Sequence, residues 1–131
     1  MGETMEEKRA FETEKAAVTG GPYSQAIIHN GLMYLSGQGP IDPFTNQVIH
    51  GTIEQETELA LENIRIILEE AGSSLNNVLQ VSAYLLNMRE YGRFNEVYRR
   101  YFPEDPPART CIQVARLPFD IRVEIDAIAY I

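Results

Sequence analysis

PPARTCIQVARLPFDIRVEIDAIA, residues 106–129, is the stretch that decides the fold of this 131-residue chain. It holds two runs in which every second residue is apolar or β-branched, one within residues 110–114 and one within residues 121–129. Alternation with a period of two predicts two strands, each with one buried face. The link at residues 117–120 is short and contains a proline, so we expect the two strands to be neighbours.

Two charged residues stand inside these strands: Arg109 at the start of the first and Glu124 in the middle of the second. A guanidinium can bind a carboxylate through two parallel hydrogen bonds, and a carboxylate beside it can accept or donate a proton. The pair therefore predicts either a pocket for a small acid that undergoes proton transfer or a structural ion pair. From chain physics alone, the structural ion pair is favoured.

The remaining elements complete one sheet with two helices. Strands are expected at residues 9–11, 24–29, 32–35 and 79–85, and amphipathic helices at 52–72 and 89–102. Asn30-Gly31 predicts a tight hairpin, while Thr52 and Gln55 have the spacing of a capping box and Gly72 suits the end of that helix.

This order of elements predicts an α+β fold, with two helices on one face of a mixed six-stranded sheet. We expect a single domain over residues 1–131, with residues 1–9 as a flexible charged extension. Because Arg122, Glu124 and Asp126 make one side of the last strand polar, we hypothesise that the open face of the sheet packs against other subunits.

Composition narrows the function. A net charge of −8 argues against a nucleic-acid partner. The single cysteine, Cys111, and the lack of a signal-like leader or a long apolar run predict a cytoplasmic protein that is not in the membrane. His29 and His50 are far apart without nearby ligands, so no metal site is expected. The glycines around Gly37 lack the pattern of a nucleotide loop, and no cofactor is expected.

Four motifs together closely resemble one family. They are GPYSQAI at 21–27, SGQ at 36–38, FNEVYRRYF at 94–102 and PARTCIQVARLPFDIRVEIDAIA at 107–129. In this order and at these separations they resemble the RidA branch of the YjgF/YER057c/UK family. The resemblance covers residues 14–131.

The resemblance implies a chorismate-mutase-like fold assembled as a homotrimer, with three sites in the clefts between subunits. It also implies a 2-iminobutanoate/2-iminopropanoate deaminase, which hydrolyses reactive enamines and imines released by pyridoxal-phosphate enzymes such as threonine dehydratase. The products are a 2-keto acid and ammonia, and no cofactor is needed. With this resemblance, a functional interpretation of Arg109 and Glu124 outweighs the structural ion pair.

The resemblance further assigns residues to roles. Arg109 would clamp the substrate carboxylate and Glu124 would position or activate water. The other residues that it implies in substrate binding are Tyr23, Ser36, Gly37, Asn95 and Cys111, the last chiefly through its backbone.

Two other functions stay open. A ligand-sensing regulatory trimer that binds small carboxylate metabolites with little turnover would carry the same motifs. Ribonuclease activity or translation inhibition is attached to relatives of this family, but the acidic charge and the lack of paired histidines weaken it here.

Overall fold

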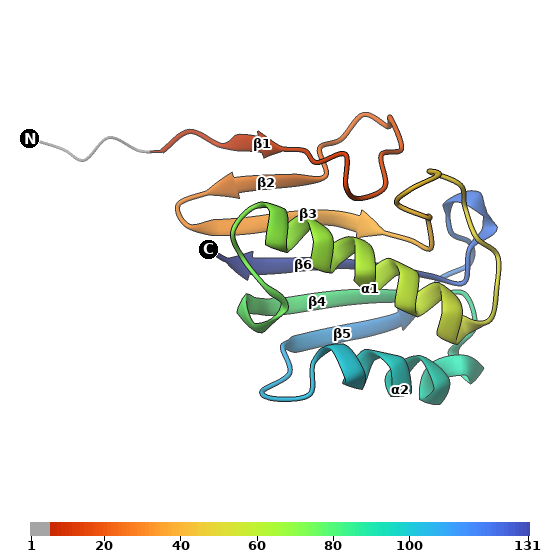
Figure 1. The fold of residues 1–131 in the computed structure, drawn as a ribbon. Helices are drawn as coiled ribbons and strands as arrows, with labels where there is room; N and C mark the ends of the chain where they lie inside the picture. Colours follow the sequence, from red (N-terminus) through yellow and green to blue (C-terminus); the bar gives the residue numbers. More distant parts are fainter. Residues whose placement is uncertain (1–5) are drawn as a thin grey trace, which may run out of the picture.

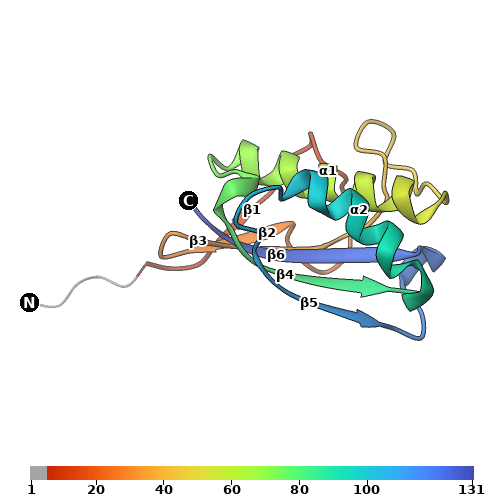
Figure 2. The ribbon, with the colours of Figure 1, turned by 90° about the horizontal axis from the view of Figure 1, so that it is seen from below.

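The computed structural model describes residues 6–131 as one sheet and two helices (Figure 1). The elements in chain order are β1 (Arg9–Phe11), β2 (Ala26–His29), β3 (Leu32–Gln38), α1 (Ile53–Glu70), β4 (Val78–Leu85), α2 (Tyr91–Tyr101), β5 (Ala108–Gln113) and β6 (Val123–Tyr130). Both helices lie on the same side of the sheet, as the view along it shows (Figure 2). The predicted α+β arrangement with a mixed six-stranded sheet is confirmed.

The strands follow the order β1-β2-β3-β6-β4-β5 across the sheet. Only β4 and β5 run parallel among these neighbours, and the other pairs are antiparallel. The prediction that β5 and β6 are neighbours is wrong, because β4 lies between them. The true connection runs over residues 114–122, which is longer than the proline-containing link and passes the end of β4. There, Val114 N–H donates to the Leu85 carbonyl at 2.9 Å.

Local sequence signals produced the elements they predict. Asn30 and Gly31 have φ values of 50° and 76°, as a tight turn between β2 and β3 requires. The Thr52 hydroxyl accepts from Gln55 N–H and the Gln55 side chain accepts from Thr52 N–H, which completes the capping box of α1. Gly72, with φ of 87°, follows the end of this helix.

The core lies between the sheet and the helices. Side chains that point to the helices from the last strand are Val123, Ile125, Ala127 and Ala129, all buried. In β5 the apolar residues of the alternating pattern are on the face away from the helices. Ile112 is 46% exposed, while Arg109 and Cys111 face α2. The prediction that the apolar alternation of this strand marks a face buried within the chain is therefore wrong.

Residues 1–5 of the expected extension lie outside the described residues. Of its remainder, Glu6 accepts a hydrogen bond from Asn30 N–H at 2.7 Å, and Arg9 pairs with Ile28 in the sheet. Within residues 6–131, no helix has the length and apolar character needed to cross a membrane.

Candidate active site

A cavity of about 540 Å³ opens beside the last residues of β3 and the first residues of β6. Tyr23, Ser36, Gly37 and Glu124 all line it, so the structure brings together four of the residues singled out from the sequence. The rest of its lining comes from the segment before β2, from Ile41 and from the loop that precedes β6. Among residues 6–131, those that line the cavity include no Lys or Arg.

Glu124 projects from β6 on the side of the sheet away from the helices, because its neighbours Val123 and Ile125 point into the core. Its side chain is partly buried. Burial raises the pKa of the Glu124 carboxyl above its ordinary value, and the charge of nearby Asp126 raises it further. A carboxyl with a raised pKa can both accept and donate protons closer to neutral pH.

Gly37 leaves the space that the Glu124 carboxyl occupies. A Cβ atom at this position would lie 2.6 Å from Oε2 and 2.8 Å from Cδ of Glu124. The pairing of the two strands is irregular here. Leu35 pairs with Ala127 and Gln38 with Ile125, so two residues of β3 lie opposite one residue of β6. Such a β-bulge redirects the chain locally, and it brings the backbone of Gly37 against the carboxyl.

Ser36 and Tyr23 are held by their own hydrogen bonds at the rim. The Ser36 hydroxyl donates to the Ser24 carbonyl at 2.6 Å. The Tyr23 hydroxyl, on a ring that is half exposed, is hydrogen-bonded to the hydroxyl of Thr19. The first bond ties the loop before β2 to the bulge of β3, and the second joins two residues within that loop.

Gln25 supports this wall and was not predicted from the sequence. Its buried amide nitrogen donates to the Thr13 and Ala17 carbonyls at 3.0 and 2.9 Å, and its oxygen accepts from Thr13 N–H at 2.7 Å. It thereby fixes the segment that closes one side of the cavity. The only sequence signal is a polar residue at the start of an apolar strand, which is too common to be specific.

Arg109 lies elsewhere, against α2. Its guanidinium carbon is 4.6 Å from the centre of the Tyr98 ring and 5.4 Å from that of Phe94, and Nη2 donates to the Tyr91 hydroxyl at 2.9 Å. Among residues 6–131, no carboxylate forms an ion pair with Arg109. Its charge is held by aromatic faces and remains available to an anion.

Arg109 and Glu124 therefore do not meet within one chain. Arg109 pairs with Val81 of β4, whose side chain is buried in the core under the helices. Glu124 pairs with Tyr84 of the same strand, whose side chain points to the opposite face of the sheet. The prediction that they are adjacent is wrong for the single chain, and so is the structural ion pair between them. The cause is the strand β4, which separates β5 from β6.

Asn95 and Cys111 lie with Arg109. A pocket of about 290 Å³ is lined by Asn95, Tyr98 and Arg109 together with residues near the end of α2. Asn95 Oδ1 and the Tyr98 hydroxyl are buried there without a hydrogen-bond partner among residues 6–131. Cys111 is partly buried beside them, and burial raises the pKa of its thiol, which disfavours the nucleophilic thiolate.

Comparison with known proteins gives a consistent picture. The sequence profile of the family described as Endoribonuclease L-PSP matches residues 13–131. A RutC family protein of Pyrococcus abyssi is 47% identical over 123 residues, which are 94% of this chain and 97% of that protein. A 2-iminobutanoate/2-iminopropanoate deaminase of mouse is 42% identical over 122 residues, 93% of this chain and 90% of the mouse protein.

A solved structure extends the likeness to three dimensions. The crystal structure of RidA from the Antarctic bacterium Psychrobacter sp. PAMC 21119 has a TM-score of 0.89 to this chain and is 38% identical. The match covers 94% of this chain and 99% of that one. The fold described above is thus shared with that structure over 94% of this chain.

Proposed function

Because the chain belongs to the Endoribonuclease L-PSP family, which includes the RidA proteins, we propose that it is a deaminase of small 2-imino acids such as 2-iminobutanoate and 2-iminopropanoate. Its reaction would convert the imines and enamines released by pyridoxal-phosphate enzymes into 2-keto acids and ammonia. The proposal is supported chiefly by Glu124, a carboxyl of raised pKa that faces a cavity whose lining, within residues 6–131, includes no Lys or Arg.

The substrate needs a cation that this cavity lacks, since an imino acid carries a carboxylate. Arg109 is a cation that forms no ion pair with a carboxylate among residues 6–131, and it lies on the other face of the sheet. We assign it to the same site through a neighbouring copy in a homotrimer, with three equivalent sites between subunits. Support comes from the open face of the sheet, where Tyr34, Ile112 and Tyr130 are each more than 40% exposed.

The reaction then follows from these two groups. Arg109 of one copy fixes the substrate carboxylate, which leaves the neighbouring C=N carbon open to water beside Glu124 of the other copy. The water oxygen bonds to this carbon as Glu124 accepts a proton from it, and the nitrogen becomes an amine. That amine takes up a proton, the C–N bond breaks with its electron pair leaving on ammonia, and the hydroxyl proton is lost as the keto group forms.

Other residues take supporting roles in this proposal. Tyr23 and Ser36 form the rim of the cleft, and Gly37 gives the Glu124 carboxyl its place. Asn95 lines the pocket of Arg109, and the backbone of Cys111, two residues further along β5, would contribute from the same side. The chemistry needs no cofactor, because a protonated imine is already a strong electrophile.

The direct test measures 2-keto-acid formation from imines generated in place by an amino-acid oxidase, with semicarbazide as a competing trap. The wild-type protein should accelerate hydrolysis, and Arg109→Ala should lose this acceleration while it stays folded. Glu124→Gln should lower kcat more than it changes KM, by about 100-fold or more, since the amide cannot accept the proton. A folded wild type without acceleration would refute the proposal and favour a ligand-sensing role.

A further inference from the structure

Phe119 is an exposed aromatic residue that lines the cavity of Glu124. It lies in the connection between β5 and β6, and its side chain is 57% exposed. Phe119 and the next residue, Asp120, have φ values of 64° and 54°, in the left-handed region that bulky residues rarely adopt. A conformation of this kind persists only where the surroundings impose it.

Hydrogen bonds from side chains and from the backbone hold this corner. The His50 ring donates from Nε2 to the Phe119 carbonyl at 2.8 Å. Arg116 Nε donates to Asp120 Oδ1 at 2.8 Å, and Asp120 N–H donates to the Leu117 carbonyl at 3.1 Å. The ring of Phe119 is thus presented on a fixed backbone.

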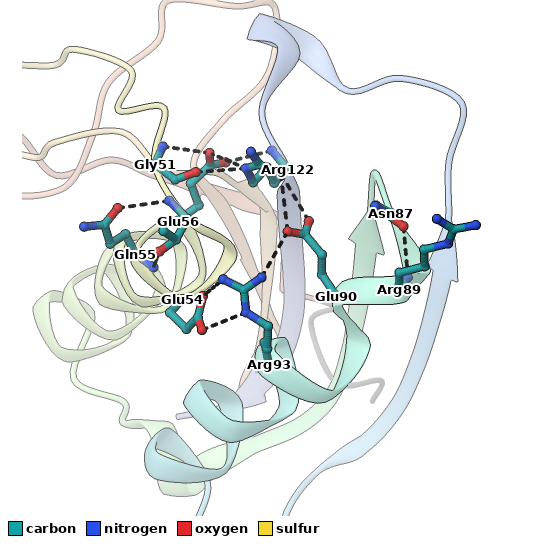
Figure 3. Close-up of polar contacts among 10 residues, drawn as sticks. Gly51, Glu54, Gln55, Glu56, Asn87, Arg89, Glu90, Arg93 and Arg122 are labelled. Atoms are coloured by element: carbon teal, nitrogen blue, oxygen red, sulfur yellow. Dashed lines mark hydrogen bonds and ion pairs between the residues drawn. The ribbon is translucent and has the colours of Figure 1, made fainter.

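A buried carboxylate anchors the end of the same loop. Glu56, only 1% exposed in α1, accepts from Arg122 N–H at 2.7 Å and from Gly51 N–H at 3.0 Å. The Arg122 side chain in turn donates to the Gly51 carbonyl at 2.8 Å and pairs with Glu90 at 3.3 Å. Figure 3 shows Arg122 between these partners, where β6 begins. The loop is joined in this way to the start of α1.

The fixed loop gives the cavity an apolar side. Pro118, Phe119 and Ile121 line it together with Ile41. In the single chain, before the neighbouring copy of the proposed trimer covers it, the cavity has a volume of about 540 Å³, within the range of pockets that hold drug-sized ligands. A longer apolar group attached to the imine carbon would find contacts on this side while the imine stays beside Glu124.

From this arrangement we infer that Phe119 determines specificity and that it favours 2-imino acids with apolar side chains longer than an ethyl group. The inference rests on the proposed deaminase function, which it deepens. A ring contacting the side chain of the substrate increases affinity for long apolar groups and adds little for a methyl group.

The experiment compares imines made from leucine and from alanine by an amino-acid oxidase. Phe119→Asn removes the ring but suits a left-handed backbone, and Phe119→Ala removes the ring alone. Phe44→Ala is the matched control, because Phe44 is 97% exposed and lies outside this cavity. Binding of pyruvate and 4-methyl-2-oxopentanoate is measured in parallel by NMR titration, which needs no turnover.

The expected result is a loss of at least about tenfold in the preference for leucine-derived over alanine-derived imine in both Phe119 variants, with a matching change in keto-acid affinities. The preference should stay unchanged in Phe44→Ala. An unchanged preference and unchanged affinities in folded Phe119→Asn would overturn the inference. A wild type that binds the keto acids with this preference but turns over neither imine would overturn the deaminase instead.

Discussion

The cavity of Glu124 and the aromatic pocket of Arg109 are built in different ways. The first is shaped mainly by backbone: a bulge in β3, the absent side chain of Gly37 and loops held by hydrogen bonds. The second is shaped by side chains, since the rings of one helix hold a guanidinium. Among residues 6–131, the lining of the Glu124 cavity has an acid but no Lys or Arg, and the lining of the Arg109 pocket has a cation but no acid. In the proposed trimer, each would supply what the other lacks.

The strongest test of this complementarity is to remove Arg109 from one copy of the chain and Glu124 from another. Arg109→Ala and Glu124→Gln should each be nearly inactive. Unfolded together and refolded as a 1:1 mixture, they should recover about a quarter of the wild-type rate, because a quarter of the sites between randomly assorted copies would combine both intact residues. If the assay shows no recovery in mixed trimers verified by mass spectrometry, both residues act from the same chain.

The backbone origin of the Glu124 cavity predicts sensitivity to a single methyl group. Gly37→Ala would place a Cβ atom against the carboxyl, so we expect kcat to fall by about tenfold to a hundredfold through displacement of Glu124. Gly92→Ala is the control, because a Cβ at Gly92, in α2, meets no atom within 4 Å. Equal rates for both variants would show that the close approach of Gly37 has no catalytic value.

The charge next to Glu124 should set the acid limb of the pH profile. The ionised form accepts the proton from water, so activity should fall as pH drops through the pKa of Glu124, above the ordinary value for a glutamate. Asp126→Asn removes the second cause of the raised pKa, and the limb should move to lower pH by a fraction of a unit, since burial remains. The test is a profile of kcat/KM from pH 4 to 8. A shift of the acid limb to higher pH in Asp126→Asn would contradict the prediction.

The smallest expected effect is on stability. A carboxyl whose pKa is raised by folding contributes stability that is greatest below its unfolded pKa and is lost as pH rises through its folded pKa. Glu124→Gln should therefore raise Tm by a few degrees at pH 7 relative to wild type, and by less at pH 4. Calorimetry at both values, with the exposed Glu104→Gln as control, checks the sign. A variant that is less stable at pH 7 would contradict it.

Sequence predicted the elements where neighbouring residues decide the structure. The turn at Asn30-Gly31 and the cap at Thr52 and Gln55 depend on contacts within a few residues, and both formed as predicted. The insertion of β6 between β3 and β4 could not be predicted, because strand pairing depends on distant segments. The apolar alternation of β5 misled for a related reason: sequence does not tell a face buried by a helix from one that stays open in the chain.

The supporting residues of the candidate site were the hardest to foresee. Glu56 reads as an ordinary acid in the first turn of a helix, where negative charge is favourable. One signal was present: it precedes Ala60 and Ile64 at four-residue spacing, on the stripe that is buried. A charge on a buried stripe indicates a partner, and here the partners are the backbone of Gly51 and the backbone and side chain of Arg122.

Glu56 also restricts the motion of the loop between β5 and β6. A loop joined to a helix through a buried carboxylate cannot open without breaking the hydrogen bonds that the carboxylate accepts, so its excursions should require much of the free energy of global unfolding. Amide hydrogens such as that of Arg122 should exchange with solvent as slowly as those of the core strands. The wall beside Glu124 would then not act as a lid, and in the proposed trimer ligands would enter by way of the boundary between copies.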